Sequence, residues 1–359
     1  MSDQAWRVVR TRYRLNWWLG EFATPRLLVA ASLLLDGSSL AAVSEAFSGG
    51  RFAPAPLVPA ERAALRRLEG SRLDDPSMPD AVRLEAPDWL AGQIGPAELR
   101  AMREPAALDL RVNLLKTTRE GACAALSAEG LDAAPTPLSA WGLRIEGRRQ
   151  VKTSRAFRRG LVEIQDEGSQ LVAALVDARP GMRVIDFCAG SGGKTLALAM
   201  TMDNRGQLVA CDTSATRLDR ADRRLRRAGV RNVERHLLVP GDTWIGRRAG
   251  SFDRVLVDAP CTGTGTWRRN PDARRRVAQA DLAEFVAQQL ALLDQAASLV
   301  RVEGRLVYAT CSLLDAENEA QVIAFLDRHP TFTRGEGLSL TPARHRTDGL
   351  FAVVLERRP

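Results

Sequence analysis

The fold class is indicated first by Asp186-Phe187-Cys188-Ala189-Gly190-Ser191-Gly192-Gly193-Lys194-Thr195. This stretch overlaps the end of an apolar run at 183–187 and the start of a run of helical periodicity at 194–200. Glycine lets the backbone approach a ligand closely, and the N-terminus of a helix presents unpaired N–H groups to it. This order of strand, glycine-rich turn and helix predicts a ligand-binding turn at the end of the first strand of an α/β domain.

The glycine-rich turn has two competing interpretations. A nucleotide phosphate loop follows the pattern G-x-x-x-x-G-K-[ST], and Val255-Leu256-Val257-Asp258 resembles the aspartate-ended strand that accompanies such loops. That pattern requires glycine at the position of Cys188, which argues against a phosphate loop. In the second interpretation the glycines only form a tight turn between strand and helix. The turn by itself leaves that alternative open.

Downstream of Gly168 the sequence alternates between apolar strands and amphipathic helices, as in a doubly wound sheet. The expected strands are 183–187, 207–211, 232–238, 253–257 and 305–309, and the expected helices are 169–178, 194–200, 217–227 and 281–300. In such folds ligands bind beyond the carboxyl ends of the strands. The fold class is therefore α/β, and residues 159–359 are predicted to form a Rossmann-like domain.

The N-terminal part of the chain reads as helical. Apolar residues recur at helical spacing over 25–46, and a second helical segment begins with proline near its first turn at 59–65. A stretch punctuated by proline at 74–79 indicates a linker. We therefore expect a short helical N-terminal module over residues 1–80.

A third region lies between this module and the Rossmann-like domain. It contains the strand-like Leu110-Arg111-Val112-Asn113, a helical segment at 119–129 and a basic run at 144–159. Residues 82–158 are accordingly predicted to form a small α+β domain.

Charge and composition narrow the class of partner. The chain has 45% hydrophobic and 26% charged residues, a formal net charge of +8 and a pI near 9.9. Nearly all of the positive charge is arginine, which favours bidentate contact with phosphate and so points to a nucleic acid. A chain rich in arginine and alanine is equally typical of a GC-rich genome. Charge alone therefore leaves the partner open.

Location and redox state follow from what the sequence lacks. No stretch approaches the roughly 20 apolar residues of a membrane span, and the first residues lack the layout of a signal peptide. The five cysteines have neither the spacings of a disulfide framework nor those of a zinc site. We expect a cytoplasmic protein with reduced thiols, no membrane association and no bound metal.

Acidic residues follow the second and third expected strands. Asp212 closes the second strand, where a carboxylate can accept both hydroxyls of a ribose. Asp242 follows the third, where a carboxylate can accept an adenine amino group. Asp212 alone would more often cap a helix or face solvent. Asp212 and Asp242 follow successive strands, and the glycine-rich turn follows the strand before them. These three strand ends together predict a nucleoside cofactor.

Two cysteines follow the fourth and fifth expected strands. Cys261 lies in Asp258-Ala259-Pro260-Cys261, and Cys311 lies in Thr310-Cys311-Ser312. Both strand ends border the same crevice in this fold, so the two thiols are predicted to face one substrate pocket. A lone cysteine is usually a small buried hydrophobic residue, and Cys123 and Cys211 are interpreted in that way. Cys188 is expected to contribute backbone rather than sulfur chemistry.

These motifs resemble the Nop2/Sun family of RNA cytosine-C5 methyltransferases, and the bacterial Sun branch, also called Fmu or RsmB, is the most similar. The resemblance covers almost the whole chain. It rests on Gln165-Asp166-Glu167-Gly168-Ser169-Gln170, the turn at 188–195, the run Asp258–Gly265 continuing into Arg268-Arg269-Asn270-Pro271-Asp272, and Thr310-Cys311-Ser312 followed by Glu317-Asn318-Glu319.

The resemblance implies roles for these residues. Cys311 would be the nucleophile, and Cys261 would help to release the product. S-adenosyl-L-methionine would be the cofactor, and its contacts would be Cys188, Ala189, Gly190, Ser191, Gly192, Gly193, Lys194, Asp212, Asp242 and Asp258. Branch members begin with a NusB-like helical domain, of which residues 1–80 are too short to be a complete copy. Residues 82–158 resemble the family's second RNA-contacting domain, although its stacking aromatic residues are not obvious here.

The chemistry of such a reaction explains the two thiols. Carbon 5 of cytosine is a poor nucleophile, so a thiolate first adds to C6 and makes C5 nucleophilic. After methyl transfer the C5 proton leaves, and a second group assists release. Asp258 is the catalytic candidate for holding a proton on N3 of a base that has been flipped out of its stack.

Other functions stay open in the sequence. A DNA cytosine-C5 methyltransferase would use the Pro-Cys cysteine as nucleophile and would not need Cys311. A non-catalytic rRNA-binding assembly factor would keep the fold, but every expected site position carries a suitable residue. The resemblance favours 16S rRNA as substrate, with tRNA as the alternative. A monomer is favoured, although nothing in the sequence fixes the oligomeric state.

Overall fold

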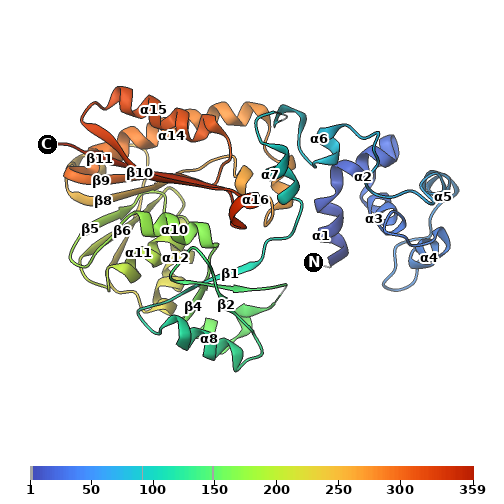
Figure 1. The fold of residues 1–359 in the computed structure, drawn as a ribbon, viewed down its shortest axis with the longest axis horizontal. Coiled ribbons are helices and arrows are strands. Elements are labelled where there is room, and N and C mark those ends of the chain that lie inside the picture. Colours follow the sequence, from blue (N-terminus) through green and yellow to red (C-terminus); the bar gives the residue numbers. More distant parts are fainter. Residues whose placement is uncertain (1–2, 91, 148) are drawn as a thin grey trace. The chain divides into compact units, whose positions relative to one another are not determined.

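The computed structural model describes residues 3–90, 92–147 and 149–359 (Figure 1). By their internal contacts these residues form two compact units. One unit runs to Glu104 and also includes Trp267–Arg276. The other comprises Pro105–Thr266 and Val277–Pro359. The three-domain division at 1–80, 82–158 and 159–359 stays a prediction, and residues 1 and 2 of its first part lie outside the described residues.

The first unit is helical, as its sequence periodicity predicts. Its helices are α1 (Asp3–Arg10), α2 (Arg12–Leu19), α3 (Pro25–Leu34), α4 (Leu40–Ala46), α5 (Pro59–Arg66), α6 (Asp80–Arg83) and α7 (Pro96–Ala101). They surround a core that contains Leu15, Leu28 and Leu65. The helical spacing over 25–46 belongs to two helices rather than one. Ser39 caps the second by accepting a hydrogen bond from Ala42 N, so a new helix begins there.

Ten residues from the second half of the sequence complete this helical unit. They include the 3-10 helix η5 (Pro271–Arg275). Arg274 is buried and donates to the backbone oxygens of Glu85 and Met102. Trp267 is also buried and lies beneath the Arg274 guanidinium. The unit therefore depends on a segment that sequence patterns place in the Rossmann-like domain.

The second unit contains a small antiparallel sheet with strand order β2-β3-β1-β4 among the described residues. Its strands are β1 (Leu108–Val112), β2 (Ala134–Pro135), β3 (Gly142–Ile145) and β4 (Val162–Ile164), with helices α8 (Arg119–Ser127) and α9 (Arg155–Arg158). A buried ion pair between Asp109 and Arg144, 2.7 Å, joins β1 to β3. The predicted mixture of helix and strand is confirmed in this region.

The same unit contains the Rossmann-like sheet that the sequence predicts. Within the described residues its order is β10-β11-β9-β8-β5-β6-β7. The strands are β5 (Arg183–Asp186), β6 (Gln207–Asp212), β7 (Val233–Leu237), β8 (Phe252–Asp258), β9 (Val300–Thr310), β10 (Phe332–Leu340) and β11 (Leu350–Arg357). The pairs from β7 across to β9 are parallel, whereas β11 and β10 add on in antiparallel fashion.

Helices cover both faces of this sheet (Figure 1). The helices that follow β4 in the chain are α10 (Glu167–Leu175), α11 (Gly193–Thr201), α12 (Ala215–Ala228), α13 (Trp244–Arg247), α14 (Gln279–Leu299), α15 (Glu319–Arg328) and α16 (Pro342–His345). Side chains alternate between the faces, so Ile185 packs with α14 and α15, and Val184 packs with α10 and α11. β5 and β8 are neighbours although the chain passes through β6 and β7 between them. The direction of winding therefore reverses beside β5, where such folds bind ligands.

Candidate active site

The two predicted thiols lie together at the carboxyl ends of β8 and β9. These strands are parallel neighbours with Asp258 opposite Ala309, so the residues that follow them share one edge of the sheet. Cys261 Sγ and Cys311 Sγ are 3.4 Å apart. Fifty positions separate the two cysteines in the chain, so this contact depends on the pairing of the two strands.

The electrostatic surroundings of Cys261 favour its protonated form. The pairing with Cys311, burial and the charge of Glu317 all raise the pKa of the Cys261 thiol well above its usual range. Cys261 therefore holds its proton, and that proton lies between two sulfur atoms. A thiol that stays protonated beside a second sulfur can donate a hydrogen bond to it, and such a bond stabilises a thiolate that leaves a substrate.

Lys194 and Asp258 form an ion pair next to the thiols. Lys194 Nζ lies 2.6 Å from Asp258 Oδ2, and the lysine side chain is almost completely buried. Burial acts to lower the pKa of Lys194, but the Asp258 carboxylate outweighs it, and the Cys311 sulfur adds to the rise. The buried ammonium is thus within electrostatic reach of Cys311.

The glycine-rich turn joins β5 to α11 in the way that its sequence predicts. Gly190 and Gly192 have positive φ values of 54° and 79°, which favour glycine. A Cβ on Gly192 would lie 3.0 Å from the Ala221 side chain of α12. A Cβ on Gly190 would meet nothing within 4 Å. An added side chain would therefore contact α12 at Gly192, whereas there is free space beside Gly190.

Asp212 and Asp242 are held by the backbone around them. Asp212 accepts from Gly190 N and from Ser214 N, both at 2.8 Å. Asp242 accepts from Trp244 N at 2.8 Å and lies 2.7 Å from His236 Nε2. Those contacts, with the Trp244 amide first, hold the pKa of Asp242 below its usual value. Both carboxylates are thus oriented at the ends of β6 and β7.

These residues suit S-adenosylmethionine, which carries a sulfonium, an ammonium and ribose hydroxyls. The ends of β5, β6 and β8 each carry a carboxylate, at Asp186, Asp212 and Asp258. Asp186 Oδ1 is buried and has no hydrogen-bond partner among the described residues. An acceptor that lacks a donor beside an open glycine turn matches a ligand with donors and positive charge.

Comparison with known proteins identifies the family. The model of the 16S rRNA methyltransferase RsmB/F family matches residues 173–356, and that of the RsmF/B-like ferredoxin-like domain matches residues 96–152. The chain belongs to the RsmB/F family. The predicted resemblance is thereby confirmed, as are the methyltransferase fold and S-adenosylmethionine as the cofactor of this family.

Individual RsmB/F relatives cover most of the chain. A probable ribosomal RNA small subunit methyltransferase B of Synechocystis is 34% identical over 299 residues, which are 76% of this chain and 66% of that protein. The Bacillus subtilis protein with the same description is 29% identical over 317 residues, 80% of this chain and 69% of its own. The crystal structure of PH0851 superposes with a TM-score of 0.83 at 27% identity, covering 98% of this chain and 88% of that one. The chain thus spans about two thirds of the curated relatives' length.

Three residues that support the cofactor turn of this RsmB/F protein were not predicted. Arg111 Nη1 donates to Gly193 O at 2.9 Å, and Arg224 Nη1 donates to Ser191 O at 2.6 Å. Burial lowers the pKa of Arg111 to about 10. Glu163 of β4 contacts Arg224. The sequence did contain a signal for Arg111, since it is a charged residue inside the apolar strand Leu110-Arg111-Val112. A charged side chain in such a strand requires a buried partner.

Asp186 was also not predicted as a functional residue. Its pKa is raised to about 7, mainly by burial. Thr195 Oγ1 donates a hydrogen bond to its Oδ2 at 2.6 Å. An acid at the last position of a buried strand was the available signal. Its position at the switch point makes it a candidate cofactor contact.

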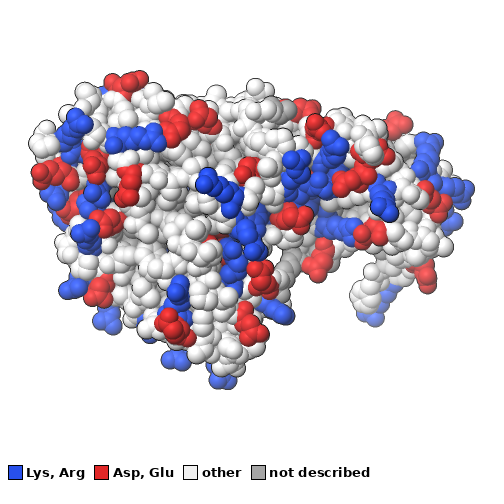
Figure 2. Space-filling view, viewed as in Figure 1, with Lys and Arg blue, Asp and Glu red and all other residues white. Residues whose placement is uncertain are grey.

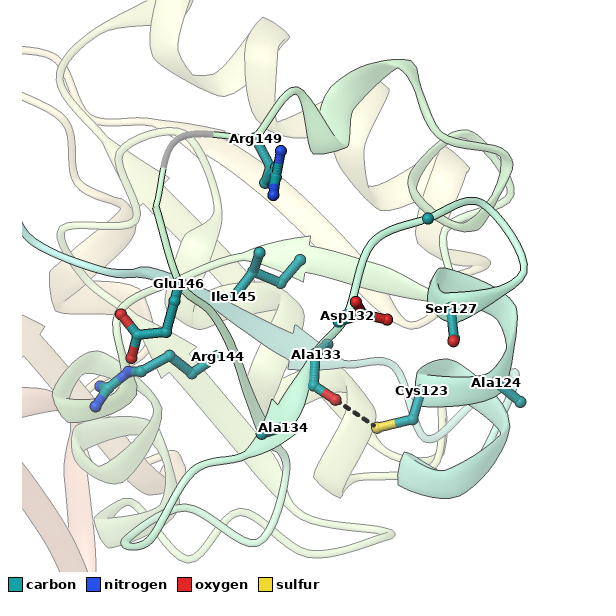
Figure 3. A pocket seen from close by; sticks show the side chains of 11 residues that line it. Cys123, Ala124, Ser127, Asp132, Ala133, Ala134, Arg144, Ile145, Glu146 and Arg149 are labelled. Atoms are coloured by element: carbon teal, nitrogen blue, oxygen red, sulfur yellow. Dashed lines mark hydrogen bonds between the residues drawn. The ribbon is translucent and has the colours of Figure 1, made fainter.

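A cavity of 630 Å³ lies on the ferredoxin-like domain (Figure 3). Among its lining residues are Cys123, Arg144 and Arg149. Cys123 Sγ lies 3.6 Å from Ala133 O and points into the domain (Figure 3). No predicted site residue and no aromatic side chain is among the described residues that line this cavity. It is therefore separate from the thiol pair and lacks a stacking platform for a base.

Membrane-spanning helices and metal-binding clusters are both absent from the described residues. None of the helices in that part of the chain is long and apolar enough to cross a membrane. The same residues contain no group of three or more histidine, cysteine and acidic side chains that could hold a metal ion.

Proposed function

We propose that this chain methylates C5 of a cytosine in RNA, with 16S rRNA as the substrate, through a covalent bond between Cys311 and C6. The observation that carries the proposal is the 3.4 Å contact between the two thiols at the ends of adjacent parallel strands. A methyl donor alone would not need two thiols, whereas activation of C5 and later release need both. The description of the family and the names of the relatives support rRNA as the substrate class.

The first step would be addition of the Cys311 thiolate to C6. The buried Lys194 ammonium lies within electrostatic reach of that sulfur and favours its negative charge. Asp258 accepts Lys194 through Oδ2. Its other oxygen would accept a hydrogen bond from a protonated N3, which offsets charge that develops in the ring. Addition places an electron pair at C5, and S-adenosylmethionine supplies the methyl group that this carbon takes.

Release would reverse the addition. The C5 proton passes to a base, the C5–H electron pair restores the C5=C6 bond, and the bond from C6 to the sulfur breaks. The departing Cys311 thiolate is then stabilised by a hydrogen bond from the Cys261 thiol. Cys261 keeps its proton during this step, since the pairing with Cys311 and burial raise its pKa, and its sulfur lies in contact with Cys311. This assignment makes Cys311 the nucleophile and Cys261 the residue that assists release.

The cofactor would lie across the ends of β5, β6 and β7. The backbone of Cys188, Ala189, Gly190, Ser191, Gly192 and Gly193 would face it, together with the side chains of Lys194, Asp212, Asp242 and Asp258. The open side of Gly190 and the aligned carboxylates support this placement. Asp212 is the residue for the ribose hydroxyls, and Asp242 is the residue for the adenine amino group.

The face shown in Figure 2 gives no charge argument for a particular RNA. On the face seen in Figure 2, lysine and arginine side chains are interspersed with acidic ones. Such a surface presents no single field of one sign. The proposal therefore rests on the thiol pair and the family, and the identity of the RNA has to be tested directly.

The decisive experiment compares wild type, Cys311→Ala and Cys261→Ala on unmodified 16S rRNA and on tRNA with S-adenosylmethionine. Cys311→Ala should lose about 1000-fold or more of the methylation rate and form no covalent complex. Cys261→Ala should be slow but accumulate covalent protein–RNA complex, which denaturing gels detect. Cys123→Ala is the matched control and should behave like wild type. Adducts that persist with Cys311→Ala and vanish with Cys261→Ala would reverse the assignment, and 5-methylcytosine in tRNA only would change the substrate.

A further inference from the structure

Glu317 is a fully buried carboxylate behind the two cysteine loops. It ends the 3-10 helix η6 (Asp315–Glu317), between β9 and α15, and its side chain has no exposed surface. No strand or glycine-rich turn contains it. Its hydrogen bonds nevertheless converge on the residues that flank both thiols, in addition to the effect of its charge on the pKa of Cys261.

One carboxylate oxygen holds the Cys261 loop. Glu317 Oε1 accepts from Thr262 N at 2.8 Å and from Gln289 Nε2 at 3.1 Å. The same Gln289 nitrogen donates to Pro260 O at 2.9 Å. The peptide groups on both sides of Cys261 are therefore fixed by Glu317 and its neighbour on α14.

The other carboxylate oxygen joins the two loops. Glu317 Oε2 accepts from Thr262 Oγ1 at 2.5 Å and also from Ser312 Oγ. Ser312 follows Cys311 directly, just as Thr262 follows Cys261. Asn318, the next residue after Glu317, accepts from Thr310 Oγ1 at 2.6 Å and donates to Ser312 O at 3.0 Å. Both residues beside Cys311 are thus held by the Glu317–Asn318 dipeptide.

The main chain of Glu317 is anchored as firmly as its side chain. Tyr308 Oη, deep in β9, donates to Glu317 O at 2.6 Å. Tyr308 is itself completely buried. A buried carboxylate is costly unless donors satisfy it, and an apolar side chain of similar size would fill this space at lower cost. A charged residue with four donors and a fixed backbone is therefore suited to holding geometry rather than to packing.

We infer that Glu317 is a positioning residue, which sets the separation of the Cys261 and Cys311 sulfurs by fixing the residue that follows each of them. The inference rests on the proposed function for its catalytic consequence. The geometric part, namely that the thiol contact depends on Glu317, stands independently of any methylation. In the covalent mechanism a small displacement of either sulfur would uncouple addition from release, because the leaving thiolate must reach the proton on Cys261.

The geometric part is tested with phenylarsine oxide, which condenses with two thiols in contact. Two As–S bonds form, and the two thiol protons leave with the arsenic-bound oxygen as water, so no oxidant is needed. Wild type should bind one equivalent through this pair, measured by intact mass, and Cys261→Ser should not. Ser312→Ala and Glu317→Ala should bind at least about tenfold more weakly, because the loops separate. Glu317→Gln should retain binding, since its amide can donate to hydroxyls that reverse direction.

The control is Glu319→Gln, two residues further on, whose exposed carboxylate pairs with Arg334 at the protein surface. This variant should bind the arsenical like wild type. Thermal melting of each variant separates misfolding from local loosening, and Ser312→Ala removes one hydroxyl only, so it remains informative if Glu317→Ala fails to fold. Capture that is unchanged in folded Ser312→Ala and Glu317→Ala would overturn the inference.

The catalytic part is tested by single-turnover methylation. Ser312→Ala should lower the rate about 100-fold with little change in the concentration of RNA needed for half-saturation, as expected for misplaced reacting groups. Glu317→Gln should recover much of the rate. A change in RNA affinity alone would contradict a positioning role. If wild type binds the arsenical through the thiol pair but methylates no cytosine, then the proposed function fails while the geometric inference survives.

Discussion

At the scale of single residues, burial and neighbouring groups set the charge state of the ionisable side chains in the site. Lys194 stays charged although it is buried, because Asp258 is 2.6 Å away. Cys261 holds its proton, because Cys311 and burial disfavour a second charge. Asp186 shares the same edge of the sheet, and its pKa is raised to about 7. The different effects of burial and nearby charge on these neighbouring groups therefore allow them to take different roles in the site.

Loss of the ammonium in Lys194→Met should slow methylation about 100-fold. The physical reason is that Asp258 loses its partner and Cys311 loses the nearby positive charge. Single-turnover rates at saturating cofactor measure the effect. Arg179→Met, at an exposed position paired with Asp177, is the control and should leave the rate unchanged. A Lys194→Met rate equal to wild type would remove the ammonium from the mechanism.

Asp186 should make the stability of the protein without cofactor fall as the pH rises. Its pKa in the folded protein, about 7, lies above the ordinary aspartate value of 3.8, so the protonated form favours folding. That contribution is complete below pH 4 and is lost as the pH rises through 7, by up to about 4 kcal/mol. Asp186→Asn should flatten this part of the dependence of melting temperature on pH, because the amide cannot ionise. A slope equal to that of wild type would show that other groups cause it.

At the scale of elements, the cofactor turn is held from outside its own strand and helix. Its backbone oxygens accept from Arg111 on β1 and Arg224 on α12, and Gly190 N donates to Asp212 at the end of β6. The small antiparallel sheet and the Rossmann-like sheet therefore meet at the turn. Cofactor affinity should therefore depend on β1, although the glycine-rich motif gives no indication that this strand contacts the turn.

Arg111→Ala should weaken S-adenosylmethionine binding about tenfold or more. The variant removes donors to Gly193 O and to Gln165, and hydrogen bonds from a charged donor contribute about 1.5–3 kcal/mol each. Titration calorimetry with S-adenosylmethionine measures the change, and melting temperature confirms folding. Arg100→Ala, outside the Rossmann-like unit, is the control. Equal affinity in folded Arg111→Ala would mean that the turn holds its shape without β1.

Gly192→Ala tests the turn from within. The residue has a φ of 79°, and a Cβ would lie 3.0 Å from the Ala221 side chain. Left-handed backbone with a side chain costs about 1–2 kcal/mol, so either stability or the shape of the turn must change. We expect a lower melting temperature together with weaker cofactor binding. Gly181→Ala, which shares a positive φ but meets no atom within 4 Å, controls for strain alone. Similar cofactor affinity in the two variants would exclude a specific role for the contact with α12.

At the scale of the whole molecule, the chain leaves one unit and returns to it. The segment Trp267–Arg276 follows the Cys261 loop in sequence, yet it packs with the N-terminal helices. Arg274 connects it to Glu85 O and Met102 O inside that helical unit. The helical unit is therefore completed only when the second half of the chain has been made.

Arg274→Ala should loosen the helical unit selectively. Two buried carbonyl oxygens lose their donor and Trp267 loses its stacking partner, which together amount to about 2–4 kcal/mol. Hydrogen exchange followed by mass spectrometry should show faster exchange in α6 and α7, with β5 and β6 unchanged. Arg276→Ala, an exposed residue that pairs with Asp272, serves as the comparison. Uniformly faster exchange in both units would contradict a local effect.

The parallel strands from β5 to β9, the glycine-rich turn, the family and the positions of both cysteines at strand ends could be predicted from the sequence. Each of these is written as a contiguous motif or as a period of apolar residues, so short-range chemistry specifies it. Strands β10 and β11 were missed. Alternating small and polar residues weaken the pattern of β10. The apolar run of β11 follows the turn dipeptide Asp348-Gly349, a signal that would have allowed this strand to be predicted.

Contacts between residues that are distant in the sequence could not be predicted and depend on the folded structure. The contact between Cys261 and Cys311 arises from the pairing of β8 with β9, and Glu317 meets Thr262 only because η6 folds back behind both loops. Arg111 on β1 reaches Gly193 at the start of α11, and Arg274 joins the helical unit from the second half of the sequence. Single long-range hydrogen bonds leave no periodic signal in the sequence. Their partners become visible only when strand order and register bring the side chains together.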